Sequence, residues 1–163
     1  MRIDTEELII RYKDDLFRIA FHVCQNKEDS DDAVQETFIQ YHTSIVEFQD
    51  EMHIKAWLIR VVINKAKDLR RFGLRRFYIP LEEYMETLEF ETPETKNIFY
   101  EVMKLPERYR MVIHLFYYEE YSIHEIAGLL KLSESNVKVR LSRGRKIPAA
   151  QLLSARCVHR KGL

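Results

Sequence analysis

Apolar residues recur every three or four positions along most of this chain, and this spacing constrains its fold more than any other feature. Glycine and proline, which interrupt helices, number only four each among the 163 residues. The sequence therefore predicts an all-α fold with short connections. The apolar positions of the first three expected helices are Leu8, Tyr12, Leu16, Ile19 and Val23, then Val34, Phe38, Tyr41 and Ile45, then Ile54, Leu58, Val61, Leu69 and Phe72.

Breaks in this pattern divide the first part of the chain into three helices. The segment QNKEDS, residues 25–30, ends the first helix, and the second is expected to begin near Ser30. The loop FQDEMHI, residues 48–54, precedes a third helix over residues 56–72. Gly73 then allows that helix to stop.

Residues 78–94, YIPLEEYMETLEFETPE, contain two prolines and many glutamates but show no clean helical period. Such a segment is typical of a connection between domains. We therefore expect an acidic linker over residues 78–95, which joins two small helical domains at residues 1–77 and 96–163.

Acidic and basic blocks alternate along the chain, although 26 acids and 26 bases give a formal net charge of zero. Residues 27–51 are acidic, residues 55–76 are basic, residues 82–101 are acidic again, and the bases from Asn136 onward have no acid among them. Two basic stretches separated by acidic ones favour two contacts with polyanions and at least one with a basic partner. The alternative for any single block is a solvated helix face.

The third helix carries four bases and one asparagine on one face, at Arg60, Asn64, Lys67, Arg71 and Arg75. Aromatic and polar side chains that could hold a displaced base stand nearby, namely Phe48, His53 and Trp57. Single-stranded nucleic acid is bound by backbone charge and aromatic stacking, and the Asn64 amide offers both a donor and an acceptor to a base edge. The alternative for Trp57 is a core tryptophan, because it borders the apolar stripe.

The pattern of residues 121–146 is typical of a helix-turn-helix. Ser122 and Glu125 form a capping-box pattern, the turn passes through Lys131 and Leu132, and Ser133 caps the second helix. Arginine and asparagine on such a helix can pair with base edges in the major groove, while other bases hold phosphates. The alternative is a helical hairpin that does not bind DNA. The outward residues are Asn136, Lys138, Val139, Arg140, Arg143 and Arg145.

Other function classes find little support in the sequence. The six histidines show no paired metal-ligand spacing, and neither a glycine-rich phosphate loop nor a nucleophile motif is present, so we expect no enzyme, no cofactor and no metal. Two cysteines, an acidic N-terminal segment and the lack of a long apolar run predict a cytoplasmic protein without membrane insertion. A one-component transcription regulator would explain the helix-turn-helix but not the first domain.

Two stretches together resemble a known family. Residues 16–71, from LFRIAFHVCQ to KAKDLRR, resemble region 2 of the extracytoplasmic-function sigma factors of bacterial RNA polymerase, and residues 105–146, from LPERYRMVIH to VRLSRGRK, resemble their region 4. The resemblance implies an alternative sigma factor that binds core RNA polymerase and directs promoter recognition, DNA melting and transcription initiation. It also implies control by an anti-sigma factor, which we expect here.

The resemblance further implies roles for individual residues. The acidic helix would dock on the clamp helices of the largest polymerase subunit through Asp31, Asp32, Gln35, Glu36 and Phe38. The polymerase flap would be a further contact. The minus-ten element would be bound by the loop matching residues 48–54 and by the basic helix, through Phe48, His53, Trp57, Arg60, Asn64, Lys67 and Arg71. The minus-thirty-five element would be bound by Ser133, Asn136, Lys138, Val139, Arg140, Arg143 and Arg145.

Two positions depart from the family pattern near the end of the second helix of the turn. Gly144 stands where family members often have alanine, and glycine weakens a helix by about 1 kcal/mol relative to alanine. Pro148 follows, so this helix is expected to end near Lys146. Val139 also replaces a more usual small polar residue.

Overall fold

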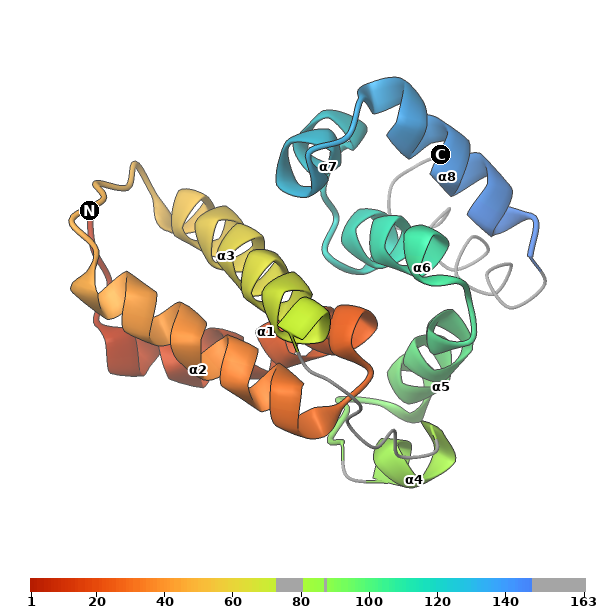
Figure 1. Ribbon diagram of the computed structural model, residues 1–163, viewed down its shortest axis with the longest axis horizontal. Coiled ribbons are helices and arrows are strands. Elements are labelled where there is room, and N and C mark those ends of the chain that lie inside the picture. The colour runs from red at the N-terminus through yellow and green to blue at the C-terminus, as the bar shows by residue number, and fades with distance from the viewer. Residues whose placement is uncertain (73–80, 87, 148–163) are drawn as a thin grey trace. The chain divides into compact units, whose positions relative to one another are not determined.

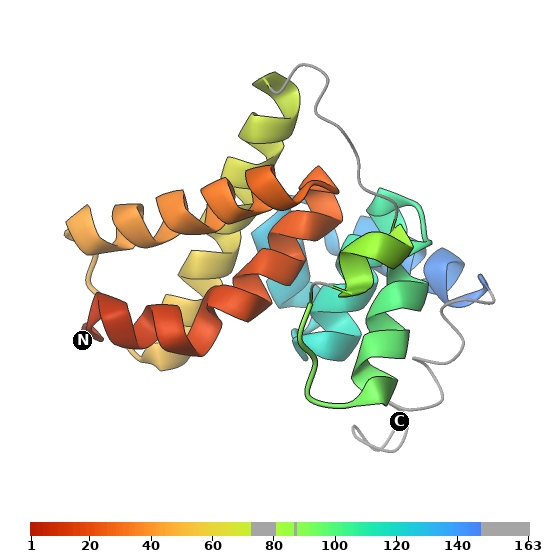
Figure 2. The same cartoon turned by 90° about the horizontal axis from the view of Figure 1, so that it is seen from below.

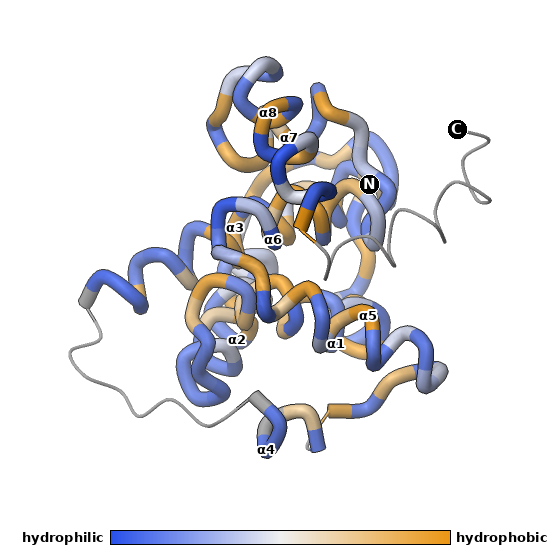
Figure 3. The backbone as a smooth tube through the Cα atoms, turned by 90° about the vertical axis from the view of Figure 1, so that its right-hand side faces the viewer, coloured by the Kyte–Doolittle hydropathy of each residue, from blue (hydrophilic) through white to orange (hydrophobic). Residues whose placement is uncertain are grey.

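Helices form all of the regular structure in the part of the chain that the structure describes, residues 1–72, 81–86 and 88–147 of a computed structural model (Figure 1). The predicted all-α fold is therefore confirmed. The chain divides into two units, Met1–Tyr78 and Ile79–Leu163. Hydrophilic and hydrophobic residues alternate along the helices, as an amphipathic pattern requires (Figure 3).

The first unit contains three helices, α1 (Thr5–Cys24), α2 (Lys27–Thr43) and α3 (Glu51–Phe72). The first two run antiparallel, and α3 packs across them (Figure 2). Gln25 ends α1 in a left-handed conformation with φ 50°, and the Asn26 side chain caps α2 by accepting from the backbone N–H of Asp29. Because of this cap, α2 begins at Lys27, ahead of the expected start near Ser30.

The third helix begins at Glu51, which corrects the expected loop over residues 48–54. Asp50 accounts for the earlier start, because its carboxylate accepts from the backbone N–H of His53 at 2.8 Å and its carbonyl accepts from that of Ile54 at 3.2 Å. The connection between α2 and α3 is therefore residues 44–50, and we call it the α2–α3 loop. Only Phe48, Gln49 and Asp50 of the expected loop belong to it.

The core of the first unit follows the apolar stripes of its three helices. The largest side chains that are almost fully buried are Leu8, Leu16, Ile19, Tyr41, Ile54, Leu58, Ile59 and Ile63. Burying a leucine or isoleucine side chain contributes roughly 1.5–3 kcal/mol, so these residues dominate the stability of the unit. Ile45 was expected in the core but is 95% exposed, because α2 ends two positions earlier at Thr43.

The second unit contains α4 (Leu81–Glu86), α5 (Pro93–Met103), α6 (Glu107–Ile113), a π-helical continuation η1 (His114–Tyr118), α7 (Ile123–Leu130) and α8 (Glu134–Arg145). The segment expected as an irregular linker, residues 78–95, thus holds α4 and the first turn of α5. Thr92 caps α5 by accepting from the backbone N–H of Thr95. Pro93 stands at the first position of α5, where proline suits a helix start, and the other proline of this segment, Pro80, lies outside the described residues.

A glycine allows α8 to approach α6 closely. A Cβ added to Gly144 would lie 2.6 Å from Ile113 Cδ1 and 3.3 Å from Tyr109 Cβ. The expected weakening of α8 relative to alanine is therefore opposed by a packing effect, because an alanine side chain would require movement of Ile113. The helix ends where predicted, with Lys146 at its C-cap. None of the helices described here is both long enough and apolar enough to cross a membrane.

Candidate nucleic-acid interface

The basic face of α3 is open to solvent. Arg60, Asn64 and Arg71 are exposed and Lys67 is half-buried, so the helical spacing places all four on the outer side of the unit. The fifth residue expected on this face, Arg75, lies outside the described residues. An exposed amide among guanidinium and ammonium groups can meet a base edge while the charges hold neighbouring phosphates.

Three aromatic rings pack together where the α2–α3 loop meets α3. The Phe48 ring lies 5.6 Å from Tyr41 and 5.7 Å from Trp57, and Tyr41 lies 6.1 Å from Trp57 between ring centroids. Such distances are typical of favourable aromatic contacts. Phe48 is only 3% exposed, so it packs against the other two rings and is not accessible for stacking with a base. Trp57 is half-buried, which makes it both a packing residue and a partly accessible ring.

His53 lies in the first turn of α3 and is exposed. Its Nδ1 accepts from the backbone N–H of Gln49 at 3.1 Å, and its ring meets the edge of Phe48 at 5.2 Å. Since Nδ1 accepts, the neutral ring carries its hydrogen on Nε2, where it can serve as a donor. The α2–α3 loop therefore sets both the position and the tautomer of His53.

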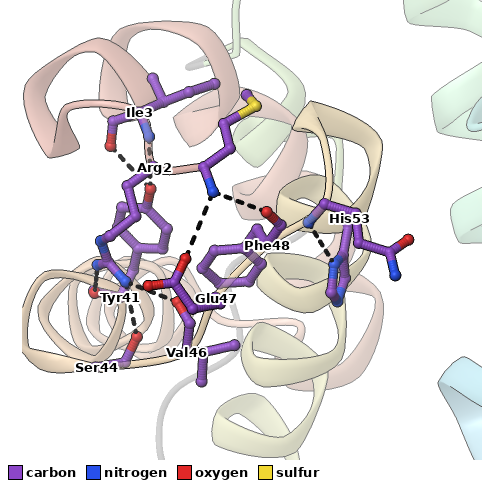
Figure 4. Close-up of polar contacts among 10 residues, drawn as sticks. Arg2, Ile3, Tyr41, Ser44, Val46, Glu47, Phe48 and His53 are labelled. Carbon is purple, nitrogen blue, oxygen red and sulfur yellow. Dashed lines mark hydrogen bonds and ion pairs between the residues drawn. The ribbon is translucent and has the colours of Figure 1, made fainter.

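The first residues of the chain hold the opposite side of the α2–α3 loop (Figure 4). The Arg2 guanidinium donates to the carbonyl oxygens of Tyr41 at 2.5 Å and Val46 at 3.1 Å, and it lies 3.5 Å from the Ser44 hydroxyl. The backbone of Ile3 exchanges two hydrogen bonds with the Tyr41 hydroxyl. The Met1 nitrogen also donates to a loop carbonyl, that of Phe48, at 2.9 Å. No local pattern links Met1, Arg2 and Ile3 to partners about forty positions away, so these contacts could not be predicted from the sequence.

The start of α3 is tied to α1 by a second polar cluster. Glu51 accepts from the Tyr12 hydroxyl at 2.5 Å and from Arg11 at 2.7 Å. Burial raises the pKa of Tyr12 above its ordinary range, and the hydrogen bond to Glu51 raises it further. The same hydrogen bond from Tyr12, followed by the one from Arg11, holds the pKa of Glu51 below its usual value. These contacts fix the first turn of α3, from which His53 projects, and Trp57 follows in the second turn.

The acidic side of α2 borders a groove between α1 and α2. Asp31, Gln35 and Glu36 are exposed, and Asp32 is half-buried. The groove has a volume of about 560 Å³ and is walled mainly by the apolar residues Ile9, Phe17, Val34, Phe38 and Ile39. Phe38 was expected at the docking surface but is 5% exposed, so it reaches that surface only as part of the groove wall. Partial burial raises the pKa of Asp31.

The two helices of the predicted helix-turn-helix, α7 and α8, form in the second unit with the caps that the sequence predicts. Ser122 and Glu125 form a reciprocal capping box, Lys131 turns the chain with φ 55°, and the Ser133 hydroxyl caps α8 by accepting from Asn136 at 3.1 Å. Val137 and Leu141 anchor α8 in the core, at 0% and 1% exposure. Ser133 is therefore the capping residue of α8, and it is exposed at the start of the helix.

The outward side of α8 has a mixed character. Lys138 and Arg143 are exposed and Val139 is 44% exposed. Arg140 is half-buried and donates from Nε to the Asn136 amide oxygen at 3.0 Å. Arg145 lies 5.6 Å from the Phe116 ring and 5.5 Å from the Tyr117 ring, which directs it toward its own unit. The seven residues predicted to contact DNA thus lie on α8 or at its N-cap, but several of them already have partners within their own unit.

Comparison with known proteins supplies a family for both units. The model for Sigma-70 region 2 matches residues 8–76, and the model for Sigma-70, region 4 matches residues 98–147. The ECF RNA polymerase sigma factor SigW of Bacillus subtilis is 28% identical over 163 residues, which cover 90% of this chain and 87% of that protein. The ECF RNA polymerase sigma factor SigM of Mycobacterium tuberculosis is also 28% identical, over 88% of this chain and 74% of its own length.

Two solved structures resemble the chain. CnrH, in complex with the cytosolic domain of CnrY, has a TM-score of 0.59 and 29% identity, with 95% of this chain and 88% of that chain covered. The sigma factor RpoE, in complex with the anti-sigma factor NepR from Bartonella quintana, has a TM-score of 0.65, with 92% and 96% covered. Its identity is 17%, so this second likeness concerns the fold alone.

Proposed function

Because this chain belongs to the extracytoplasmic-function sigma factors of RNA polymerase, we propose that it binds core RNA polymerase and directs promoter recognition, DNA melting and transcription initiation. On this proposal it is a regulatory protein without catalytic chemistry of its own, and it works in the cytoplasm, where the polymerase acts. The first unit, which matches Sigma-70 region 2, would contact polymerase and the minus-ten element. The second unit, which matches region 4, would contact the minus-thirty-five element.

The exposed basic face of α3 is the observation that carries the proposal. Arg60, Lys67 and Arg71 would hold the phosphates of the separated non-template strand, and the Asn64 amide would contact one base edge. The half-buried Trp57 ring and the Nε2 donor of His53 would complete the pocket. Phe48 would contribute by supporting both rings from inside.

Docking to the polymerase would use the acidic side of α2 and the adjoining groove. Asp31, Asp32, Gln35 and Glu36 offer carboxylates and an amide to a basic, helical partner such as the clamp helices of the largest subunit. The apolar walls of the groove, Phe38 among them, would bury nonpolar side chains of that partner. A second contact, between the second unit and the flap, belongs to the same proposal.

Duplex DNA at the minus-thirty-five element would be bound by α8. Asn136, Lys138 and Val139 stand on the outward side of its first two turns, where a recognition helix contacts base edges. Arg140 and Asn136, which are hydrogen-bonded to each other, would together face the major groove of the DNA. Arg143 and Arg145 lie in the last turn and would hold phosphates, Arg145 after its guanidinium leaves the Phe116 and Tyr117 rings. The Ser133 hydroxyl would contribute by capping the helix.

Control by an anti-sigma factor is also part of the proposal. RpoE was solved with the anti-sigma factor NepR, and CnrH with the cytosolic domain of CnrY, and both resemble this chain over most of its length. A protein that covered either the groove on α2 or the basic face of α3 would prevent promoter use.

Transcription with purified core polymerase over a randomised promoter library tests the proposal. Addition of the chain should produce transcripts that share minus-ten and minus-thirty-five sequences, and the chain should copurify with the polymerase. A chain that binds DNA but neither copurifies with core polymerase nor changes its transcripts would be a stand-alone regulator, and the proposal would be wrong.

A further inference from the structure

We propose that Arg2 is a positioning residue for base recognition: it holds the α2–α3 loop in the shape that places His53 and Trp57 at the minus-ten site. This inference rests on the function proposed above for that site. Arg2 itself touches no base in the proposal. It acts through Phe48, the buried side chain that the loop carries under both rings.

Arg2 joins the end of α2 to the loop through its planar guanidinium group. The Tyr41 carbonyl, 2.5 Å away, belongs to the last turn of α2, where a cation complements the helix dipole. The Val46 carbonyl, 3.1 Å away, belongs to the loop itself. One side chain therefore sets the distance between the helix end and the middle of the loop.

The same guanidinium lies on the aromatic cluster. Its central carbon is 4.5 Å from the Tyr41 ring centroid and 5.9 Å from that of Phe48. Tyr41 is 0% exposed and exchanges two hydrogen bonds with the backbone of Ile3, which holds the segment next to Arg2 in place. Arg2 thus contacts a fixed ring on one side and a loop ring on the other.

From Phe48 the arrangement extends to the residues expected to contact DNA. Its ring meets His53 at 5.2 Å and Trp57 at 5.7 Å, and the neighbouring Gln49 N–H sets the His53 tautomer. Release of the loop would displace Phe48, free the His53 ring and open one side of Trp57. The basic face of α3, one or more turns farther on, would keep its shape because it depends on helix geometry.

Arginine is required for this role because lysine cannot reproduce it. A guanidinium group donates in two directions within one plane while its face lies on a ring, whereas an ammonium group is a compact point charge. Arg2 is exposed and stands at the edge of the unit, away from the buried leucines and isoleucines that hold α1, α2 and α3 together. Its replacement should therefore alter the loop and leave the helices folded.

The first measurement uses the full chain without polymerase. Trp57 is the single tryptophan of the protein, so its fluorescence reports on the loop directly. Arg2→Ala and Arg2→Lys should both shift its emission to longer wavelength and increase quenching by acrylamide, with an unchanged far-UV circular dichroism spectrum. Lys96→Ala, which removes one positive charge from α5 in the other unit, is the control and should leave the emission unchanged. Unaltered emission and quenching in Arg2→Ala would overturn the proposal.

The second measurement is open-complex formation by holoenzyme on promoters varied one base at a time. A good base contact gives about 5- to 150-fold discrimination, and in Arg2→Ala and Arg2→Lys that ratio should fall toward one at a minus-ten position. Preferences at minus-thirty-five positions and assembly with core polymerase should stay at wild-type values. A uniform loss over all promoters would show a purely structural role and overturn the proposal. If the wild-type chain itself supports no initiation, the proposed function fails, and the fluorescence result still decides whether Arg2 holds the loop.

Discussion

Replacement of Gly144 by alanine should destabilise the second unit, although alanine is the better helix former. The added Cβ would lie 2.6 Å from Ile113 Cδ1 and 3.3 Å from Tyr109 Cβ, and Ile113 is 0% exposed, so the contact can be relieved only by movement of a buried side chain. Overpacking of this kind typically costs about 1–3 kcal/mol. Removal of glycine from a helix returns about 1 kcal/mol. The expected outcome is a net loss of up to about 2 kcal/mol in the free energy of unfolding.

Gly128 provides the matched control in the same unit. It is exposed on α7, and an added Cβ there would meet no atom within 4 Å. Gly128→Ala should therefore show the helix gain alone, about 0.4–1 kcal/mol of added stability. The same substitution type should thus change stability in opposite directions at two glycines.

Urea unfolding of the full chain, followed by far-UV circular dichroism, measures both effects, and thermal unfolding provides a check. For a domain of 60–100 residues, 1 kcal/mol corresponds to a shift of about 4–8 °C in Tm. The free energy of unfolding should be lower than that of wild type in Gly144→Ala and higher in Gly128→Ala. If Gly144→Ala stabilises the unit as much as Gly128→Ala, then α6 and α8 do not require a glycine at their contact, and the packing argument fails.

Three further predictions concern the first unit. Asn64→Ala should remove about 1–3 kcal/mol of discrimination between bases at one minus-ten position. Arg71→Ala should instead weaken binding to all promoters alike and lower the salt dependence of binding. Open-complex formation on single-base promoter variants measures both effects. A uniform loss in Asn64→Ala would assign it a structural role. Glu36→Lys should weaken assembly with core polymerase in a pull-down while circular dichroism stays unchanged, and normal assembly would mean that the docking surface lies elsewhere. The hydrogen bond from Tyr12 lowers the pKa of Glu51 below its ordinary 4.5, so this contact stabilises the fold above pH 4.5 and the stabilisation is lost as pH falls through the lowered pKa. Glu51→Gln should therefore reduce the loss of stability in acid, measured by urea unfolding across pH.

Features that depend on neighbours in sequence were predictable. The starts of α7 and α8 follow from caps only three positions apart, Ser122 with Glu125 and Ser133 with Asn136, and the structure contains both caps. The outward face of α3 follows from 3.6-residue periodicity, which needs no tertiary information. The end of α8 near Lys146 belongs to the same group.

Features that depend on tertiary contacts were not predictable from local pattern. Periodicity continued the apolar stripe of α2 to Ile45, because nothing local distinguishes that position from Tyr41, yet the helix stops before it. The suitability of Gly144 depends on Ile113, which lies on another helix. A propensity scale compares glycine and alanine in isolation, whereas here the space between two helices decides which of them fits.

The same distinction separates two kinds of contact at the proposed minus-ten site. Phosphate binding by Arg60 and Arg71 requires only that α3 be a helix, so any sequence with that spacing would provide it. Placement of the rings at the start of α3 requires a loop of defined shape, and this loop takes its shape from contacts with Arg2, far away in the sequence. Affinity for single-stranded DNA should therefore survive many changes in residues 1–50, whereas base preference should depend on them. A sequence pattern can indicate that such a chain binds nucleic acid, but the preferred base is set by side chains that the pattern does not connect.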